Sequence, residues 1–349
     1  MPPATVVAKA RALMQQKIEA ERSRVERFGQ VRPLMATEAF GKRLVVVRNV
    51  IYEYDKRKYF SNFLWDFVTR TFGSEWCETE AAKTEAERHP VMQWMIEGVR
   101  YMSTQPLQAD GSRRGIPSGI VAALLNFGYD LYNVADHNEL DDLFLHRLKN
   151  RDLFQGARHE LFAEATCLRA GCSIERENEQ DGANRHAEFT AIHNATGQHL
   201  SVEAKSKQYA GVLGKRGQSN SKLRLAFGAL INSAIRKNPP YPLVIFIDTN
   251  LPFHVADKLF PREPGNVPSG KISRALEEVN KQHGGRDPYS MIVFTNHPHH
   301  YAARDEKDPH KHVYSVVSTD TTVNEAALRS LHQAALLYGN VPNEFPANN

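Results

Sequence analysis

Two short segments in the second half of the chain are apolar at almost every position. They are Leu243–Ile247 and Met291–Thr295, built from Val, Ile, Leu, Met and Phe with a single Thr. A strand with one solvated face alternates apolar and polar residues, whereas a strand buried on both faces does not. The two segments therefore predict buried central strands of a sheet.

The pattern from about residue 152 to 250 predicts a helix, three strands, a helix and a strand, in that order. In Phe154–Arg169 the apolar residues recur at helical spacing, and Gly171 follows near the C-terminal end. The three strand candidates, the second helix and the last strand are Cys172–Arg176, His186–Ile192, His199–Lys205, Lys222–Arg236 and Leu243–Ile247. Asn and Gly between the second and third strands suit a hairpin loop. This order predicts an α/β fold with a mixed sheet.

Most of the remaining predicted elements are helices. Helical spacing or strong helix formers mark Thr5–Glu21, Tyr59–Phe72, Val91–Met102, Ile120–Val134, Ile272–Gln282 and Asn324–Leu337, and Leu44–Tyr54 is β-branched and aromatic, typical of a strand or hairpin arm. A chain of 349 residues is long enough for two domains, or for one domain with a large extension. We expect a mainly helical N-terminal region of unknown role over residues 1–150 and an α/β domain over residues 151–349.

The composition is that of a globular protein. Hydrophobic residues make up 41% and charged residues 24% of the chain, which excludes a mostly disordered or fibrous protein. No apolar run approaches the ~18 residues of a membrane helix, and the first residues lack the layout of a signal peptide. Cys77, Cys167 and Cys172 have no CxxC spacing and cannot form a disulfide framework. We expect a soluble, cytoplasmic protein with no membrane partner.

The distribution of charge is more informative than its total. The formal net charge is +4, yet residues 1–60 carry +7, and residues 204–247 carry +8 without one carboxylate. Residues 151–203, directly before the second basic stretch, carry −4. A basic stretch of this kind is either a solvated helix face or a surface that binds a phosphate backbone. The residues that precede it favour the second interpretation.

Four charged residues form the candidate chemistry. Side chains alternate along a strand, so Glu203 and Lys205 project to one face while their neighbours face the core. Glu188 lies across the predicted hairpin, where the two carboxylates can meet at one end of neighbouring strands. Glu160 lies on the preceding helix, which can pack against the sheet. Buried charges require partners or a metal. A chance Glu203–Lys205 salt bridge with unrelated carboxylates is the simpler alternative.

These residues resemble the PD-(D/E)xK nuclease superfamily of restriction endonuclease-like folds. Glu203-Ala204-Lys205 is similar to the (D/E)xK half of that motif, Glu188 stands at the position of the acidic residue in the PD half, and Glu160 at that of the helix glutamate in a Gly-x-x-x-Glu pattern. The resemblance covers about residues 152–250 and implies an αβββαβ core with a mixed sheet.

The sequence departs from the pattern of this superfamily in two ways. Ala187 stands where the motif has proline, and the residue after it is Glu where the motif has Asp. Asp181, in a predicted loop, is an alternative to Glu188 for the acidic role.

The resemblance implies a metal-dependent hydrolysis of phosphodiester bonds. Glu188, Glu203 and the backbone carbonyl of Ala204 would bind Mg²⁺, with Mn²⁺ as a substitute, and Glu160 would contact the metal directly or through water. The metal would polarise the scissile phosphate and activate a water. Lys205 would orient or deprotonate that water, or stabilise the charge that develops on the phosphate.

The basic stretch that follows gains a role from this resemblance. Five side chains directly after the candidate strand are expected to bind the backbone of a nucleic acid, most readily DNA: Lys207, Lys215, Arg216, Lys222 and Arg224. The N-terminal basic region would add to DNA binding or mediate self-association as a homodimer. Two alternatives stay open: a catalytically silent nuclease fold that binds nucleic acid, and an enzyme that acts on a small phosphorylated molecule.

Other motifs carry less weight. Gly265–Lys271 matches the start of a nucleotide-binding P-loop, but Ile272 replaces the metal-binding Ser or Thr, so a turn before a helix is expected. The histidines around His297–His300, with His310 and His312, are expected in a polar loop rather than a zinc site. Asp136–Asp142 is expected to be a solvated acidic surface.

Three further residues have roles that the sequence leaves open. His159 and His186 adjoin the candidate carboxylates and would either touch substrate or be structural. Asp248, at the end of a predicted strand, is a candidate loop cap.

Overall fold

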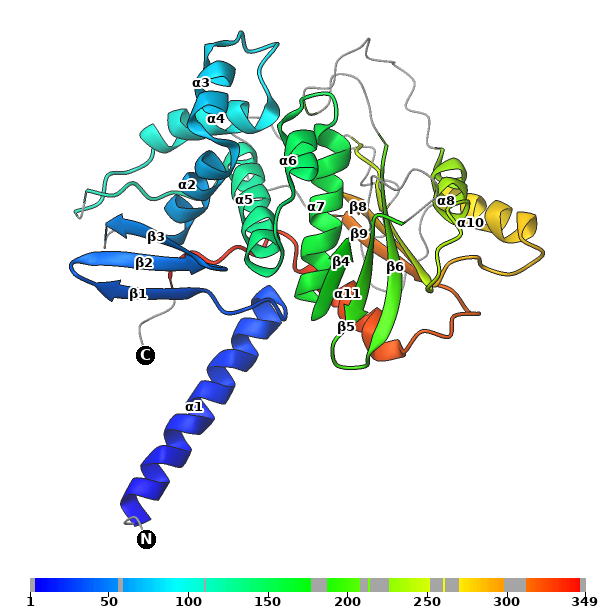
Figure 1. Cartoon of the computed structure of the whole chain (residues 1–349), viewed down its shortest axis with the longest axis horizontal. Helices are drawn as coiled ribbons and strands as arrows, with labels where there is room; N and C mark the ends of the chain where they lie inside the picture. The colour runs from blue at the N-terminus through cyan, green and yellow to red at the C-terminus, as the bar shows by residue number, and fades with distance from the viewer. Residues whose placement is uncertain are drawn as a thin grey trace.

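The computed structural model describes residues 4–55, 59–109, 111–176, 187–207, 213, 226–251, 260, 270–297 and 312–345. Within these ranges the chain forms ten helices and nine strands in two sheets (Figure 1). The helices are α1 (Ala4–Phe28), α2 (Phe60–Phe72), α3 (Ser74–Ala82), α4 (Pro90–Ser103), α5 (Gly119–His137), α6 (Asp142–Lys149), α7 (Phe154–Arg169), α8 (Phe227–Ile235), α10 (Gly270–Gln282) and α11 (Glu325–Leu336). The strands are β1 (Met35–Ala39), β2 (Lys42–Val47), β3 (Val50–Asp55), β4 (Cys172–Arg176), β5 (Phe189–His193), β6 (Gln198–Ser206), β7 (Leu243–Asp248), β8 (Met291–Asn296) and β9 (His312–Val317). The predicted mixed α/β class is confirmed.

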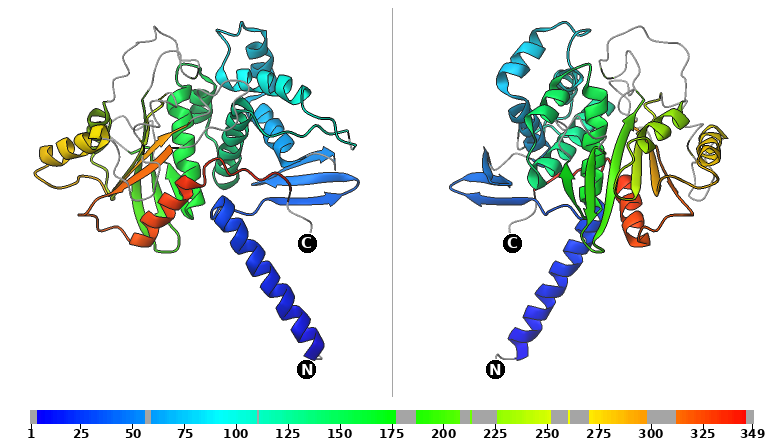
Figure 2. Two further views of the ribbon diagram at one scale, coloured as in Figure 1. Left: turned by 180° about the vertical axis from the view of Figure 1, so that it is seen from behind. Right: turned by 45° about the vertical axis from the view of Figure 1, so that its right-hand side comes forward.

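The larger sheet has the strand order β4-β5-β6-β7-β8-β9. The pairs β6–β7 and β7–β8 are parallel, and the other three pairs are antiparallel. Helices α7 and α8 lie on opposite sides of this sheet (Figure 2). The sheet is therefore mixed and covered on both faces, which explains the continuous apolar runs Leu243–Ile247 in β7 and Met291–Phe294 in β8.

Strand β7 illustrates this double burial. Val244 and Phe246 belong to the apolar core on the α7 side, and Ile245 and Ile247 belong to a second core formed with α8 and α10. All six residues of the strand are buried. The apolar run at Leu243–Ile247 thus forms the central strand that its composition predicts.

The part of the chain before α7 consists of a three-stranded antiparallel sheet and helices α1 to α6. Helix α5 packs against α2, α4 and α7. One buried apolar cluster continues from Val45 and Phe63 through Phe127 to Ala165 and Val202. The helices of the N-terminal part and the α7 face of the larger sheet therefore share one core.

A buried ion pair also joins the two parts. Arg169 of α7 donates to the Asp130 carboxylate of α5 over 2.5 Å, and both side chains are buried. The same residue anchors the end of α1, because its carbonyl accepts a hydrogen bond from the Gln30 backbone amide at 2.7 Å. Beyond this anchor α1 extends away from the rest of the molecule (Figures 1 and 2).

Several elements differ from the sequence prediction. The segment Leu44–Tyr54 lies in two strands of a hairpin, whose last pair, Val47 and Val50, encloses a turn in which Arg48 has φ 56°. Strands β1 and β9 and helices α3 and α6 were not predicted. Strand β1 (MATEA) has little β-propensity of its own and forms because it pairs with β2 along its whole length.

The predicted solvated surface at Asp136–Asp142 is confirmed for Glu139, Asp141 and Asp142, which are exposed, and is wrong for Asp136. Asp136 is buried, and its carboxylate accepts the Arg48 backbone amide at 2.8 Å. Asp141 caps α6 by accepting the Phe144 amide at 2.7 Å. A side-chain oxygen at a helix N-terminus satisfies a free backbone amide, so Asp141 serves local structure while it stays exposed.

Among the described helices, none combines the length and the apolar character that a membrane span requires.

Candidate active site

The register of the β5–β6 hairpin brings two predicted carboxylates together. Phe189 pairs with Val202, and the Glu188 amide donates to the Val202 carbonyl at 3.1 Å. Glu188 thus stands opposite Glu203 at the end of this ladder, and side chains of opposed residues share one face of a sheet. Lys205 lies two residues beyond Glu203 and projects to the same face.

The carbonyl of Ala204 lies at this same point. The Val202 carbonyl faces β5, and carbonyls two residues apart along a strand point the same way, so that of Ala204 also faces the β5 side. Within the described residues the β5–β6 ladder ends at Phe189 and Val202. The carbonyl oxygen of Ala204 therefore lies on the β5 side of β6, just beyond the last residue pair of the ladder and on the same side as Glu188.

Glu203 is the most deeply buried member of the group. Its side chain has 0% exposure, against 17% for Lys205 and 21% for Glu188. Its Oε1 accepts from Lys205 Nζ and, at 2.7 Å, from Lys237 Nζ. Its Oε2 is buried and has no hydrogen-bond partner among the described residues. An acceptor in this state carries an unsatisfied desolvation cost, which a bound cation would remove.

The carboxylates of Glu188 and Glu203 influence each other's pKa. Burial, followed by the charge of Glu188, raises the pKa of Glu203 to about 7. Burial also acts to raise the pKa of Glu188, but Lys237 and Lys205 outweigh it and hold that pKa below its usual value. Two close carboxylates resist simultaneous ionisation. Glu188 is thus the first of the pair to ionise.

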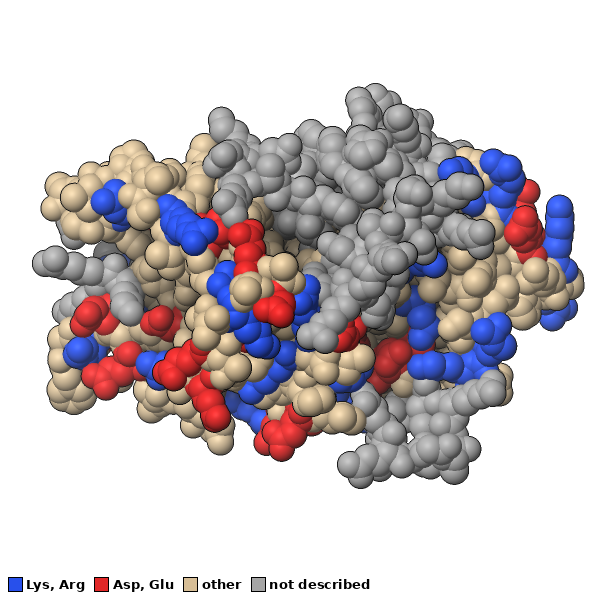
Figure 3. All heavy atoms as spheres, turned by 90° about the horizontal axis from the view of Figure 1, so that it is seen from above, with Lys and Arg blue, Asp and Glu red and all other residues tan. Residues whose placement is uncertain are grey.

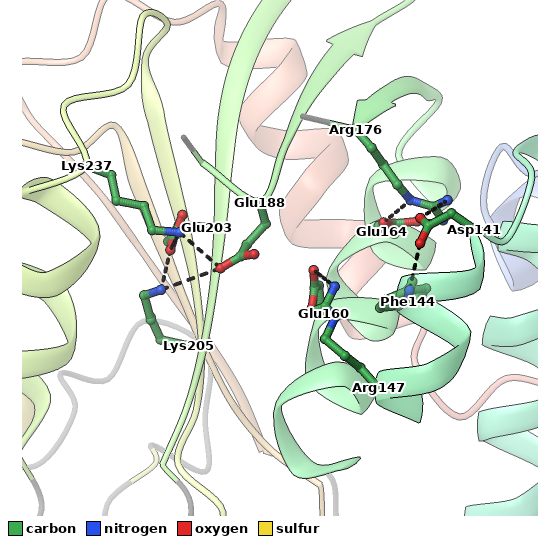
Figure 4. Close-up of polar contacts among 10 residues, drawn as sticks. All are labelled: Asp141, Phe144, Arg147, Glu160, Glu164, Arg176, Glu188, Glu203, Lys205 and Lys237. Carbon is green, nitrogen blue, oxygen red and sulfur yellow. Dashed lines mark hydrogen bonds and ion pairs between the residues drawn. The ribbon is translucent and has the colours of Figure 1, made fainter. Parts of the chain in front are cut away.

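Glu160 lies on α7, on the other side of Glu188 from the lysines (Figure 4). Both of its carboxylate oxygens accept from the Arg147 guanidinium, at 2.7 and 3.0 Å. Burial and then the charge of Glu188 raise the pKa of Glu160, and Arg147 opposes them. Glu160 is thus electrostatically coupled to Glu188 but hydrogen-bonded to an arginine.

Sequence reasoning missed Lys237. Its Nζ lies 2.7 Å from Glu203 Oε1 and 3.3 Å from Glu188 Oε1, so it contacts both candidate metal ligands (Figure 4). Burial acts to lower the pKa of Lys237, but the two carboxylates outweigh it and raise that pKa. Lys237 follows α8 and lies far from Glu203-Ala204-Lys205 in sequence, so no motif relates it to the site. Only its place in the basic stretch of residues 204–247 could have indicated it.

Most of the predicted nucleic-acid-binding residues fall beyond the described part of the chain. Lys207 directly follows β6, and its amide donates to the Asp248 carbonyl at 3.0 Å. Lys215, Arg216, Lys222 and Arg224 lie outside the described residues, as does His186. On the described surface in Figure 3, basic and acidic side chains alternate on the central part, with further basic side chains toward the end where α8 and α10 lie.

A second group of possible ligands lies in the interior. His159, Asp248 and His297 are all buried, and one nitrogen or oxygen of each lies within 4.8 Å of the others. Arg158 already supplies a cation there, because its Nη1 lies 3.2 Å from His297 Nε2 and its charge opposes the rise in the pKa of Asp248 that burial causes. This group is a buried polar network with its own positive charge.

Two residues whose roles the sequence leaves open belong to this network. His159 is buried with 0% exposure and stacks on Phe162, so it lies in the interior and not on the protein surface. Asp248 accepts the Asn250 amide at 3.2 Å and caps the loop after β7, as expected. His297 is buried in the core beside Phe162 and does not lie in a polar loop, which corrects the prediction for that residue.

Comparison with known proteins does not assign the chain to a family. No family model matches it, and none of the curated proteins matches it significantly.

Proposed function

We propose that this protein is a divalent-metal-dependent nuclease that hydrolyses phosphodiester bonds in DNA. The observation that carries the proposal is the pairing of Glu188 with Glu203 across β5 and β6, with Lys205 on the same face. The order α7, β4, β5, β6, α8, β7 supports a restriction endonuclease-like core, since it is the αβββαβ order. The position of Glu160 on α7, coupled to Glu188, adds the fourth expected group.

The residues at this site suit a divalent cation. Glu203 has a buried oxygen without a hydrogen-bond partner among the described residues, and Glu188 is held in its ionised form. Carboxylate and carbonyl oxygens are the ligands that Mg²⁺ prefers. Glu188, Glu203 and the Ala204 carbonyl would therefore hold Mg²⁺, with Mn²⁺ as a substitute, and Glu160 would assist. A bound divalent cation would polarise the scissile phosphate and make water a better nucleophile at neutral pH.

The protein side chains supply orientation and charge. The Lys205 ammonium is held against Glu203, two residues along a rigid strand, so its position is fixed before substrate arrives. A fixed positive charge directed at the scissile group stabilises the negative charge that develops on its oxygens. Lys205 is thus placed to contact the phosphate.

DNA is the proposed substrate because the site adjoins a long basic segment. Residues 204–247 carry eight Lys and Arg and no carboxylate. A continuous phosphate backbone would engage several of these charges, whereas a small phosphorylated molecule would need only one or two. The contacts would be independent of sequence, so they supply affinity rather than specificity.

The test is a cleavage assay with the purified full-length protein. Supercoiled, linear and single-stranded DNA and RNA would each be incubated with Mg²⁺, Mn²⁺ or EDTA. Glu203→Ala and Lys205→Ala should each lower cleavage about a hundredfold or more. Glu175→Ala is the matched control, because Glu175 lies on the neighbouring strand β4 with an exposed side chain.

Two outcomes would reject the proposal. Cleavage that survives both Glu203→Ala and Lys205→Ala would exclude this site as the catalytic centre. Metal-independent DNA binding without cleavage of any substrate would instead favour the silent nucleic-acid-binding module.

A further inference from the structure

Lys237 is positioned by the end of a helix rather than by a strand. The amides of Lys237 and Asn238 donate to the carbonyls of Ala234 and Ile235 at 3.1 and 3.0 Å, which continues α8 by a tight last turn. Asn238 then takes a positive φ of 47°, and Pro239 and Pro240 prevent further helix. The lysine side chain is thereby directed from α8 to the carboxylates of β5 and β6.

The charges of this group balance in the metal-free protein. Glu188 and Glu203 together carry two negative charges when ionised, and Lys205 and Lys237 carry two positive charges. Both ammonium groups contact Oε1 of Glu203, and both lie within 3.6 Å of Oε1 of Glu188. A divalent cation added to this arrangement would leave a partly buried site with two excess positive charges, which is costly at low effective dielectric.

The two lysines differ in how easily each can leave. Lys205 belongs to β6, whose backbone fixes it beside Glu203. Lys237 reaches the site from the short segment between α8 and β7, and its side chain is 26% exposed, the largest value of the four. A long flexible lysine side chain can swing outward without moving the strands.

We propose that Lys237 is an internal cation that competes with the divalent metal for Glu188 and Glu203 and contacts a substrate phosphate once displaced. This inference rests on the proposed function. The phosphate adds the negative charge that the metal-bound site lacks, so metal and nucleic acid bind cooperatively. Lys237 is the residue that couples the two ligands, and the coupling is reciprocal.

The first experiment measures Mn²⁺ binding to the full-length protein without nucleic acid, by calorimetry or by the electron paramagnetic resonance of free Mn²⁺. Lys237→Met should bind Mn²⁺ about tenfold more tightly than the unsubstituted protein, since one competing charge is gone. The matched control is Arg236→Met, which removes a positive charge from the same turn but from an exposed side chain. Its Mn²⁺ affinity should change less than about twofold, because an exposed charge is screened.

The second experiment measures the coupling. A phosphorothioate oligonucleotide that resists cleavage should raise the Mn²⁺ affinity of the unsubstituted protein, and should raise that of Lys237→Met distinctly less. Lys237→Gln, which keeps a hydrogen-bond donor, provides a second uncharged variant in case the Met variant does not fold, as judged by circular dichroism.

The outcomes separate this inference from the proposed function. Equal or weaker Mn²⁺ binding by both uncharged variants would overturn the role of Lys237 while leaving the nuclease proposal standing. The absence of Mn²⁺ binding by every form, including the unsubstituted protein, would overturn both.

Discussion

Glu160 and Glu164 lie one turn apart on α7, and each is paired with an arginine. Glu160 binds Arg147, and Glu164 binds Arg176 through two hydrogen bonds of 2.8 Å (Figure 4). Both glutamate side chains are buried, with 9% and 3% exposure. They differ in one respect that matters for function: among the causes that raise the pKa of Glu160 is the charge of Glu188.

Glu160 and Glu164 provide a test of the candidate site in which Glu164 is the control. Glu164→Gln should lower the free energy of unfolding by about 1–3 kcal/mol, because it weakens a charged hydrogen bond. Glu160→Gln should lower it less, because burial and the charge of Glu188 raise the pKa of Glu160 and so reduce what its ionised form contributes to stability. Glu160→Gln alone should also lower metal-dependent cleavage by about a hundredfold, since it removes a carboxylate beside the proposed metal ligands. Denaturant unfolding and the cleavage assay measure the two effects. Equal cleavage by the two variants would place Glu160 outside the site.

His89 provides a pH prediction that is independent of the site. Its buried ring caps α4 by accepting the Val91 amide at 3.2 Å. Burial, the largest cause, lowers its pKa from 6.5 to about 3. Between these values the unfolded chain binds a proton that the folded protein does not, so this residue makes the protein less stable as pH falls below 6.5.

The comparison with His89→Asn isolates that effect, because Asn also caps helices and does not titrate. From pH 7 to pH 5 the free energy of unfolding of the unsubstituted protein should fall by about 2 kcal/mol more than that of the variant. Unfolding in urea at several pH values measures the difference. Parallel pH curves would show that His89 has an ordinary pKa in the folded protein.

At the residue scale the sequence identified the carboxylates but not all of their partners. Glu203 and Lys205 follow from the two-residue period of a strand, and Glu188 follows from the hairpin register. Lys237 and Arg147 could not be found in this way. Lys237 reaches the site from the segment after α8 and Arg147 from α6, and no local period relates either residue to the strands.

Among the elements, the junction between α1 and the rest of the molecule is the most constrained. Gly29 has φ 81°, and its amide donates to the Val25 carbonyl at 2.8 Å to end the helix. A Cβ at this position would lie 2.6 Å from the Arg169 carbonyl oxygen and 2.7 Å from its Cβ. Gly41, in the β1–β2 turn, has nearly the same φ of 79°, but a Cβ there would have no described atom within 4 Å.

Substitution of Gly29 and of Gly41 by Ala distinguishes the cost of a positive φ from the cost of a steric overlap. Gly41→Ala should cost about 1 kcal/mol through its positive φ alone. Gly29→Ala should cost about 2–4 kcal/mol, because the overlap with Arg169 adds to the same strain. Thermal unfolding of both variants tests this, with a clearly larger fall in Tm expected for Gly29→Ala. Similar shifts would mean that α1 is not held tightly against α7.

Helices and strands were predicted correctly where their apolar residues follow a clear period. They were missed where an element forms only because it pairs with or packs against another part of the chain. The buried strands β7 and β8 and the amphipathic helix α2 are evident from their side chains. Strand β1 depends on β2, and α6 depends on its Asp141 cap and on Phe144 and Leu148 packing inward. The acidic residues around Asp141 concealed that helix, because they indicate a solvated surface unless the cap is recognised.

At the scale of the whole molecule, α1 and the candidate active site lie at opposite ends of the larger sheet. The base of α1 adjoins Gly171, because a Cβ there would meet the Gln30 side chain at 2.5 Å. Gly171 in turn accepts the Asn194 amide at 3.1 Å, in the turn that joins β5 to β6. Glu188 and Lys205 lie at the other ends of those two strands. Basic residues of α1 are therefore remote from the proposed metal ligands.

The distance of α1 from the proposed metal ligands, together with the proposed function, predicts which basic residues would bind DNA. Lys215, Arg216 and Lys222 belong to the carboxylate-free stretch of residues 204–247, which begins within β6, whereas Lys9, Arg11 and Lys17 lie on α1. If each of the first three neutralises one phosphate, their joint replacement by Ala should reduce the slope of log K against log salt for duplex DNA by about 2–3. The matched triple replacement on α1 should leave the slope nearly unchanged. Fluorescence anisotropy at several salt concentrations, with Ca²⁺ in place of Mg²⁺, measures both slopes, and a larger change for the α1 variant would move the DNA-binding surface to the N-terminal helix.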